Sequence, residues 1–147
     1  MNINYFKCLD KLNNAKSDIE NLWEQAQLSN TKSFEDKQAY HLIENILESL
    51  DTAYYKLHRL SLPTIEGKLK EDTQTGKFEL IENETGKGMG WQFSCGSYLE
   101  VFGDDGEWYP GRVEHTTRDG YKGYYFYNCE LEHPFLYTGL RARTRRG

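Results

Sequence analysis

One stretch of the sequence decides the fold: Asp104-Asp105-Gly106-Glu107-Trp108-Tyr109-Pro110-Gly111-Arg112-Val113. An Asp-Gly pair is typical of a tight turn between two antiparallel strands. Successive side chains of a strand point to opposite faces, so Trp108 and Tyr109 should separate and Val113 should point inward. We therefore expect a turn and the following strand of a small β domain.

The sequence around this stretch has the same character from Pro63 onward. Gly, Asn and Asp separate short segments rich in Tyr, Phe, Val and Trp, which is typical of small all-β domains. The expected strands are 77–82, 98–102, 108–115, 123–127 and 136–143. Five short strands favour a small closed barrel, because closure removes exposed sheet edges. We predict an SH3-like β-barrel over residues 65–145, with aromatic side chains supplying much of its core.

The chain before Pro63 has a helical pattern. Apolar residues recur at steps of three and four over residues 5–28 and 34–60. Ser33 followed by Asp36 fits a capping box at the start of the second helix, and Pro63 should end it. Since only residues 29–33 separate the helices, we expect an antiparallel hairpin over 3–62 and an α+β fold. Its apolar stripe could pack within the chain, or form a coiled coil with a second copy or a partner.

The opening stretch resembles the turn and second strand of Tudor and related SH3-like domains, whose recurring form is acidic-Asp-Gly-x-x-Tyr-Pro-x-x-hydrophobic. Residues 123–127 and 139–143 extend the resemblance, whereas residues 128–132 depart from the family where it usually supplies a ring. The resemblance implies an aromatic cage for a methylated lysine or arginine. The candidate cage and rim residues are Trp108 or Tyr109 with Tyr125 and Tyr127, and Asp104 or Asp105. Alternatively, these aromatic residues fill the barrel.

The C-terminal half also resembles an uncharacterised family of small domains from Gram-positive bacteria, often encoded on plasmids, phages and other mobile elements. The similar segments are Gly96-Ser97-Tyr98-Leu99-Glu100-Val101, residues 108–113, and Leu140-Arg141-Ala142-Arg143. The resemblance supplies no active site. It implies a context in which small acidic proteins are often inhibitors of host defence, including anti-CRISPR proteins that occupy a nucleic-acid groove.

The charge distribution narrows the choice of partner. The chain has a net charge of -5, and residues 63–140 contain 14 acidic and 7 basic residues. This excess favours a protein partner with a basic surface over general nucleic-acid binding. The C-terminal arginines could instead grip phosphates in a nucleic-acid-associated module, or pair with the acidic barrel. The candidate binding residues are Asp104, Asp105, Glu107, Trp108, Tyr109, Arg112, Tyr125, Tyr127, Arg141, Arg143, Arg145 and Arg146.

No catalytic or metal-binding pattern stands out. Cys129 and His133 have a ligand-like spacing, but no second pair accompanies them. The glycine-rich segment 86–90 matches no phosphate-binding loop, and the adjacent Asp104 and Asp105 should point apart. We expect a protein without enzymatic activity, metal or cofactor. The N-terminus lacks the features of a signal peptide and no apolar run approaches ~18 residues, so we expect a cytoplasmic protein.

Overall fold

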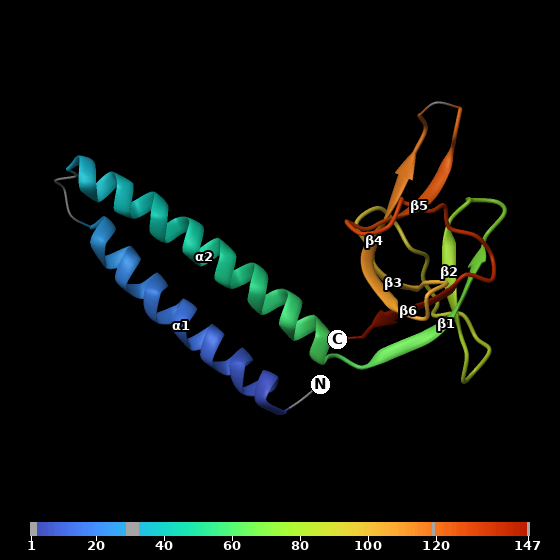
Figure 1. Cartoon of the computed structure of the whole chain (residues 1–147), viewed down its shortest axis with the longest axis horizontal. Helices are drawn as coiled ribbons and strands as arrows, with labels where there is room; N and C mark the ends of the chain where they lie inside the picture. The colour runs from blue at the N-terminus through green and yellow to red at the C-terminus, as the bar shows by residue number, and fades with distance from the viewer. Residues whose placement is uncertain (1–2, 29–32, 119, 147) are drawn as a thin grey trace. The chain divides into compact units, whose positions relative to one another are not determined.

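The computed structural model describes residues 3–28, 33–118 and 120–146. The chain divides into two compact units, one ending at Leu62 and the other spanning Pro63–Arg146. The first is a helical hairpin and the second is a six-stranded antiparallel sheet, so the predicted α+β class is confirmed (Figure 1). No helix in the described ranges is long and apolar enough to cross a membrane.

The hairpin consists of α1 (Ile3–Gln27) and α2 (Phe34–Ser61), which run antiparallel beside each other (Figure 1). The predicted capping box is confirmed: Ser33 Oγ accepts from the Asp36 amide at 3.1 Å, and Asp36 accepts from the Ser33 amide at 2.9 Å. These hydrogen bonds from Ser33 lower the pKa of Asp36. Of the predicted turn, only Ser33 lies within the described residues.

A narrow seam joins the two helices. Lys16 Nζ lies 2.5 Å from Asp51 Oδ1, and the rings of Trp23 and Tyr40 stack with their centroids 5.0 Å apart. Leu9 and Leu47, each 8% exposed, are the only buried apolar side chains of the described helices. The hairpin therefore leaves much of its apolar stripe outside the seam.

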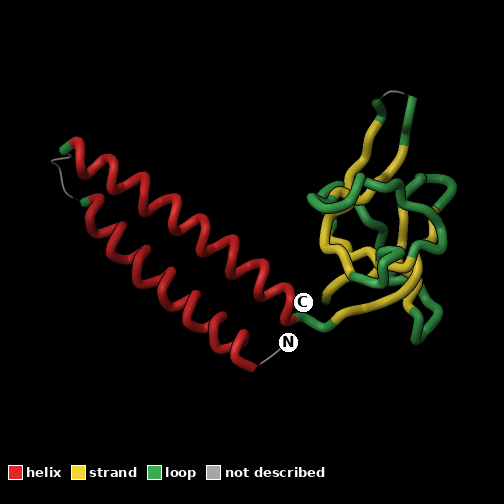
Figure 2. Tube along the Cα trace, in the orientation of Figure 1, coloured by secondary structure: helices red, strands yellow, loops and turns green. Residues whose placement is uncertain are grey.

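The sheet contains one more strand than the sequence pattern predicts, in the order β2-β1-β6-β3-β4-β5. Figure 2 shows its strands in yellow and the loops that join them in green. The strands are β1 (Thr64–Glu71), β2 (Phe78–Glu82), β3 (Tyr98–Phe102), β4 (Trp108–Thr116), β5 (Gly123–Tyr127) and β6 (Arg141–Arg145). The prediction missed β1, whose Lys, Glu and Gly residues have low strand propensity. It also began the last strand too early, because a turn from Tyr137 to Leu140 precedes β6.

The sheet is an open, barrel-like structure, so the predicted full closure is wrong. Its outer strands, β2 and β5, do not pair with each other within the described ranges. Loops cover their edges instead: Phe93 N donates to Phe78 O at 2.8 Å, and Leu136 N donates to Tyr124 O at 3.0 Å. Both edges thereby satisfy part of their backbone hydrogen-bonding capacity without a further strand.

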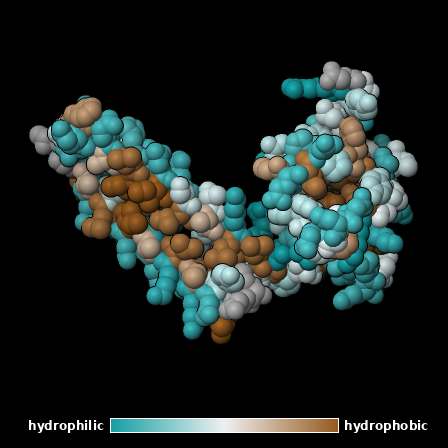
Figure 3. Space-filling view, in the orientation of Figure 1, coloured by the Kyte–Doolittle hydropathy of each residue, from teal (hydrophilic) through white to brown (hydrophobic). Residues whose placement is uncertain are grey.

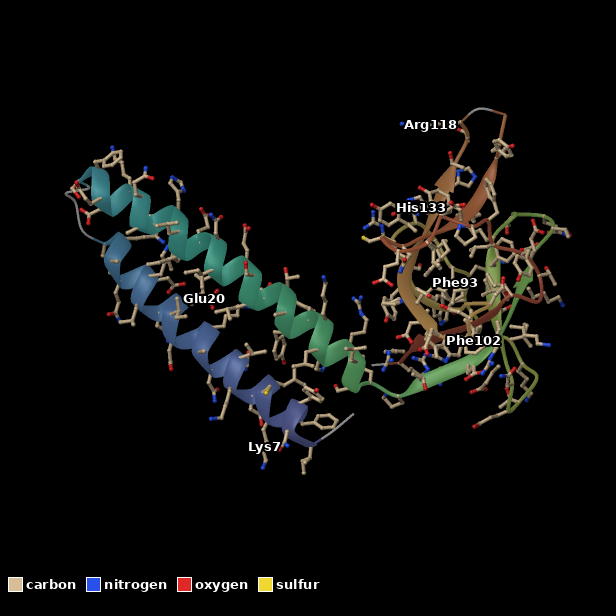
Figure 4. The ribbon with its side chains drawn as sticks, viewed as in Figure 1. Lys7, Glu20, Phe93, Phe102, Arg118 and His133 are labelled. Atoms are coloured by element: carbon tan, nitrogen blue, oxygen red, sulfur yellow. The ribbon has the colours of Figure 1, made fainter. Side chains whose placement is uncertain are left out.

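The core lies inside the curved sheet, where Phe93 is enclosed (Figure 4). As predicted, Val113 is buried, and Trp108 and Tyr109 lie on opposite faces of β4. Tyr109 packs against the core, and Trp108 faces outward opposite Phe102. Gly111 permits close packing: an added Cβ would lie 2.4 Å from Tyr127 O and 2.5 Å from the Phe126 ring. The core consists of Leu69, Phe78, Leu80, Phe93, Leu99, Val101, Val113, Phe126, Leu136, Leu140 and Ala142.

Candidate functional site

The turn between β3 and β4 forms one side of the candidate site. Gly106 adopts a positive φ of 86°, which glycine tolerates without strain, and Gly103 N donates to Glu107 O at 2.8 Å. The Asp105 carboxylate accepts a short hydrogen bond from the Tyr109 hydroxyl and another from Glu107 N at 3.1 Å. These bonds lower the pKa of Asp105, with Tyr109 contributing most. Asp105 is thereby fixed over Tyr109.

The loop that follows β5 carries Glu130, whose charge reaches Tyr109. The hydrogen bond to Asp105 is the main cause that raises the pKa of Tyr109, and the charges of Glu130 and Glu107 add to it. We call the set Asp104, Asp105, Glu107 and Glu130 the acidic edge. Asp104, Glu107 and Glu130 are exposed. The acidic edge therefore combines residues of two loops that are separated in the sequence.

Asn128 holds the second loop in position. Its buried side chain accepts from Glu130 N at 2.6 Å and from Leu131 N at 2.9 Å, and its Nδ2 donates to Pro110 O at 2.5 Å. Sequence reasoning missed Asn128 and Glu130 as site residues. An Asn directly after a strand is a signal for an Asx turn, which would have indicated this loop.

On the outer face of the sheet, the buried carboxylate of Glu100 binds two arginines. It accepts the Nε–H of Arg143 in a short hydrogen bond and the Nε–H of Arg145 at 2.5 Å. The Tyr98 hydroxyl also donates to it at 2.5 Å. Burial alone raises the pKa of Glu100, but the hydrogen bonds from Arg145, Tyr98 and Arg143 outweigh burial and lower it. Burial and the contact with Glu100 raise the pKa of Tyr98 to about 12.

The C-terminal arginines thus form an ordered ladder along β6: Arg141, Arg143 and Arg145. Arg141 pairs with Glu66 at 2.7 Å and lies over the Phe102 ring at 4.0 Å. Arg143 lies over the Trp108 ring at 4.2 Å. Of the two alternatives for these arginines, the geometry supports pairing with the acidic barrel. Arg146 follows the ladder and is exposed.

Tyr127 lies between two other side chains on the outer face. The Arg112 guanidinium is 4.4 Å from its ring centroid, and the His133 ring stacks on it at 4.7 Å with an interplanar angle of 7°. Figure 4 shows His133 on the loop beside β5. Arg112 also pairs with Glu114 at 2.6 Å, and Tyr125 meets His133 edge-on at 6.1 Å.

The predicted single aromatic cage does not form. Trp108 pairs with Phe102, whereas Tyr127 pairs with Arg112, four residues farther along β4. At ~3.3 Å per residue this separates the two positions by about 13 Å. Tyr109 points to the core side, and arginines of the chain itself already cover Trp108 and Tyr127. Alternation along the strand was predicted correctly, but the pairing register separates the rings.

The residues considered for catalysis or metal binding do not come together in one site. The three cysteines, Cys8, Cys95 and Cys129, are exposed and free. Within the described ranges, no group of three or more His, Cys, Asp or Glu side chains is arranged to hold a metal ion. The features that remain are a charged edge and an outer face with internally paired arginines.

Fold and site together define a small α+β protein in which a helical hairpin precedes a barrel-like domain with an acidic edge. The chain belongs to the family DUF5348, described as a domain of unknown function, whose model matches residues 67–144. The match starts in β1 and ends in β6, so the family corresponds to the barrel. Neither a curated protein nor a solved structure matches the chain. This match to an uncharacterised family agrees with the resemblance expected from the sequence.

Proposed function

We propose that this chain is a non-catalytic binding protein whose acidic edge engages a basic surface of a protein partner. One observation carries the proposal: Asp105 is hydrogen-bonded to the Tyr109 hydroxyl, and the charges of Glu107 and of Glu130, from a second loop, act on the same group. Over the same domain, Glu66 and Glu100 pair with the three arginines of the ladder and reduce its net charge from +3 to +1. The acidic edge itself carries four carboxylates.

The fixed positions of Asp105 and of the backbone at Glu130 support the proposal. The hydrogen bond from Tyr109 fixes the Asp105 carboxylate, and Asn128 fixes the backbone that carries Glu130. Charges held in place before binding lose less side-chain entropy on association than freely rotating ones. A basic partner would also relieve the mutual repulsion of these carboxylates and associate faster at low salt.

A narrower form of the proposal concerns a nucleic-acid-binding partner. The groove of such a partner is lined with lysine and arginine, which suits an acidic edge. A mobile-element-encoded inhibitor of host defence, such as an anti-CRISPR protein, would act in this way. The alternative nucleic-acid-associated role has less support, because the guanidinium groups of the ladder are occupied by Glu66 and Glu100.

Affinity capture from a bacterial lysate, with mass spectrometry and with or without nuclease, tests the proposal. The full chain should retain a basic protein in stoichiometric amounts after nuclease treatment. Asp104→Lys with Glu107→Lys should abolish retention. The matched control, Glu71→Lys with Glu84→Lys, changes two exposed carboxylates outside the acidic edge by the same charge.

Three outcomes would contradict the proposal: no retained protein, equal loss in both double variants, or retention that disappears with nuclease. The last outcome would favour the nucleic-acid-associated alternative. Arg146→Ala would then be the next variant, because Arg146 lies beyond the paired ladder and is exposed.

A further inference from the structure

The helical hairpin has an apolar stripe on α2 that the seam does not cover. Leu42, Ile46, Ala53 and Leu60 are four or seven residues apart and therefore share one face of the helix. The exposed fractions of Leu42, Ile46 and Leu60 are 64%, 51% and 47%. Solvated apolar side chains aligned along a helix indicate a surface for association.

α1 carries a corresponding stripe. Ala15, Ile19, Leu22 and Ala26 follow one another at steps of four, three and four, and Leu22 is 67% exposed. Together these two stripes are called the apolar face. Figure 3 shows hydrophobic residues of the hairpin gathered on one visible side.

Helix geometry places both stripes on the same side of the hairpin. Leu22 immediately precedes Trp23, and Ile46 immediately precedes Leu47; Trp23 and Leu47 both belong to the seam. One residue turns an α-helix by about 100°. The two helices run in opposite directions, and they face the seam from opposite sides. Because both of these are reversed, the residue just before a seam residue points to the same side of the hairpin on α1 and on α2.

Charge divides the hairpin into two unlike halves, with the Lys16–Asp51 ion pair near the boundary. The open half, residues 3–16 and 50–61, contains five basic and two acidic residues, a net charge of +3. The turn half, residues 17–28 and 34–49, contains one basic and seven acidic residues, a net charge of -6. The hairpin is therefore electrostatically complementary to a reversed copy of itself.

We propose that a second copy of this chain covers the apolar face, with the two hairpins antiparallel in a four-helix bundle. A two-fold axis near the middle of the hairpin brings each open half onto the turn half of the other copy. Exposed charges lie along the two stripes in the required order. They are Lys11 and Lys56 on the open half, and Asp18 and Glu35 on the turn half, each four or seven residues before an apolar-face residue.

The side of the hairpin that carries the apolar face is large enough for a stable dimer. Helices of 25 and 28 residues are about 40 Å long at ~1.5 Å per residue. Two helices at an interaxial distance of ~10 Å present a width of about 20 Å. The resulting face is about 800 Å², close to the ~800 Å² that each partner contributes to a standard specific interface.

Sedimentation of the full-length chain over a range of micromolar concentrations tests the proposal. The chain should sediment as a dimer, and Ile46→Lys should weaken the dimer at least about tenfold because it places a charge between apolar faces. Tyr55→Lys is the matched control: Tyr55 is 62% exposed but lies nine residues from Ile46, on the opposite side of α2. Its dimer should match that of the unmodified chain.

A charge exchange keeps the proposal testable if Ile46→Lys fails to fold. Lys11→Glu with Lys56→Glu makes both halves acidic, and Asp18→Lys with Glu35→Lys reduces the acidic charge of the turn half. Each variant alone should form a weaker dimer than the unmodified chain. An equimolar mixture should recover dimer mass and helical circular dichroism relative to the average of the two variants alone. In one of its two contacts an open half of +3 meets a turn half of -6, and in the other the exchanged residues again carry opposite charges.

A monomeric unmodified chain would overturn the proposal and assign the apolar face to the chain's own barrel or to another protein. Failure of the mixture to recover the dimer would overturn the antiparallel arrangement. The proposal rests on the hairpin alone, so either result leaves the acidic edge of the barrel unaffected.

Discussion

Glu100 of β3 lies directly opposite Arg143 of β6, and its buried carboxylate accepts the Nε–H of that arginine. Arg145, two residues farther along β6, binds the other oxygen of the same carboxylate at 2.5 Å. Glu100 is 2% exposed, so its charge depends on these two partners and on Tyr98 for solvation. The contact joins β3 to β6 in the middle of the sheet, where only two residue pairs define their register.

Replacing Glu100 should therefore destabilise the barrel. Glu100→Gln leaves Arg143 and Arg145 without their counter-charge, and we expect a loss of about 3 kcal/mol in the free energy of unfolding. Urea unfolding followed by the fluorescence of Trp91 and Trp108, with Trp23→Phe as background, measures this loss. Glu66→Gln is the control: the Glu66 side chain is 35% exposed and pairs with Arg141 alone, so its loss should stay below ~1 kcal/mol. Equal losses would contradict the role of Glu100.

Acid should weaken the barrel through the same carboxylate. Burial opposes the charge of Glu100, but its hydrogen bonds hold the folded-state pKa below the ordinary value of 4.5. Because the unfolded chain binds the proton more tightly, the stabilisation is fully present above about pH 4.5 and is lost as the pH falls through the lower folded-state pKa. Urea unfolding at several pH values should show a smaller loss for Glu100→Gln than for the unmodified chain. Asp72 and Asp105, whose pKa values are also lowered, should leave a residual slope in the variant.

Local patterns in the sequence predicted the elements better than the contacts between them. The capping box at Ser33, the Asp-Gly turn and the inward Val113 each depend on neighbouring residues, and all three are confirmed. β1 escaped prediction because Gly67 occupies an inward position and Lys and Glu occupy the outward ones, and these residue types have low strand propensity.

Long-range pairing explains what the sequence could not predict about the site. Glu100 and Arg143 are 43 residues apart, so nothing local shows that the arginine cluster is a paired strand. Trp108, Tyr125 and Tyr127 share the outer face, but only the register of β3, β4 and β5 shows that they lie too far apart for one cage. The pairing register depends on how the whole domain packs. The alternating pattern of a single strand does not carry this information.

Gly111 should tolerate no side chain. In Gly111→Ala the new Cβ would lie 2.4 Å from Tyr127 O and 2.5 Å from the Phe126 ring, so β4 and β5 must separate or Phe126 must leave its site. We expect a loss of about 2–3 kcal/mol in the free energy of unfolding, measured by urea titration. Pro110→Ala, at the exposed neighbouring position, should lose less than ~1 kcal/mol. A stable Gly111→Ala protein would show that Phe126 can repack.

Deleting residues 141–147 should unfold the barrel and not merely remove a basic tail. β6 lies between β1 and β3, and its Ala142 and Thr144 are buried on the core side. The deletion breaks two strand pairings and leaves Glu100 buried without either arginine. We expect the combined loss in the free energy of unfolding to exceed the ~5–15 kcal/mol by which small domains are stable. Far-ultraviolet circular dichroism should show loss of the strand signal with the helical signal retained, and the tryptophan fluorescence of Trp91 and Trp108 should move to the red. Arg146→Ala is the control that removes one basic group beyond β6, and its spectra should match those of the unmodified chain. A deletion variant that keeps the folded barrel would contradict the assignment of β6 to the centre of the sheet.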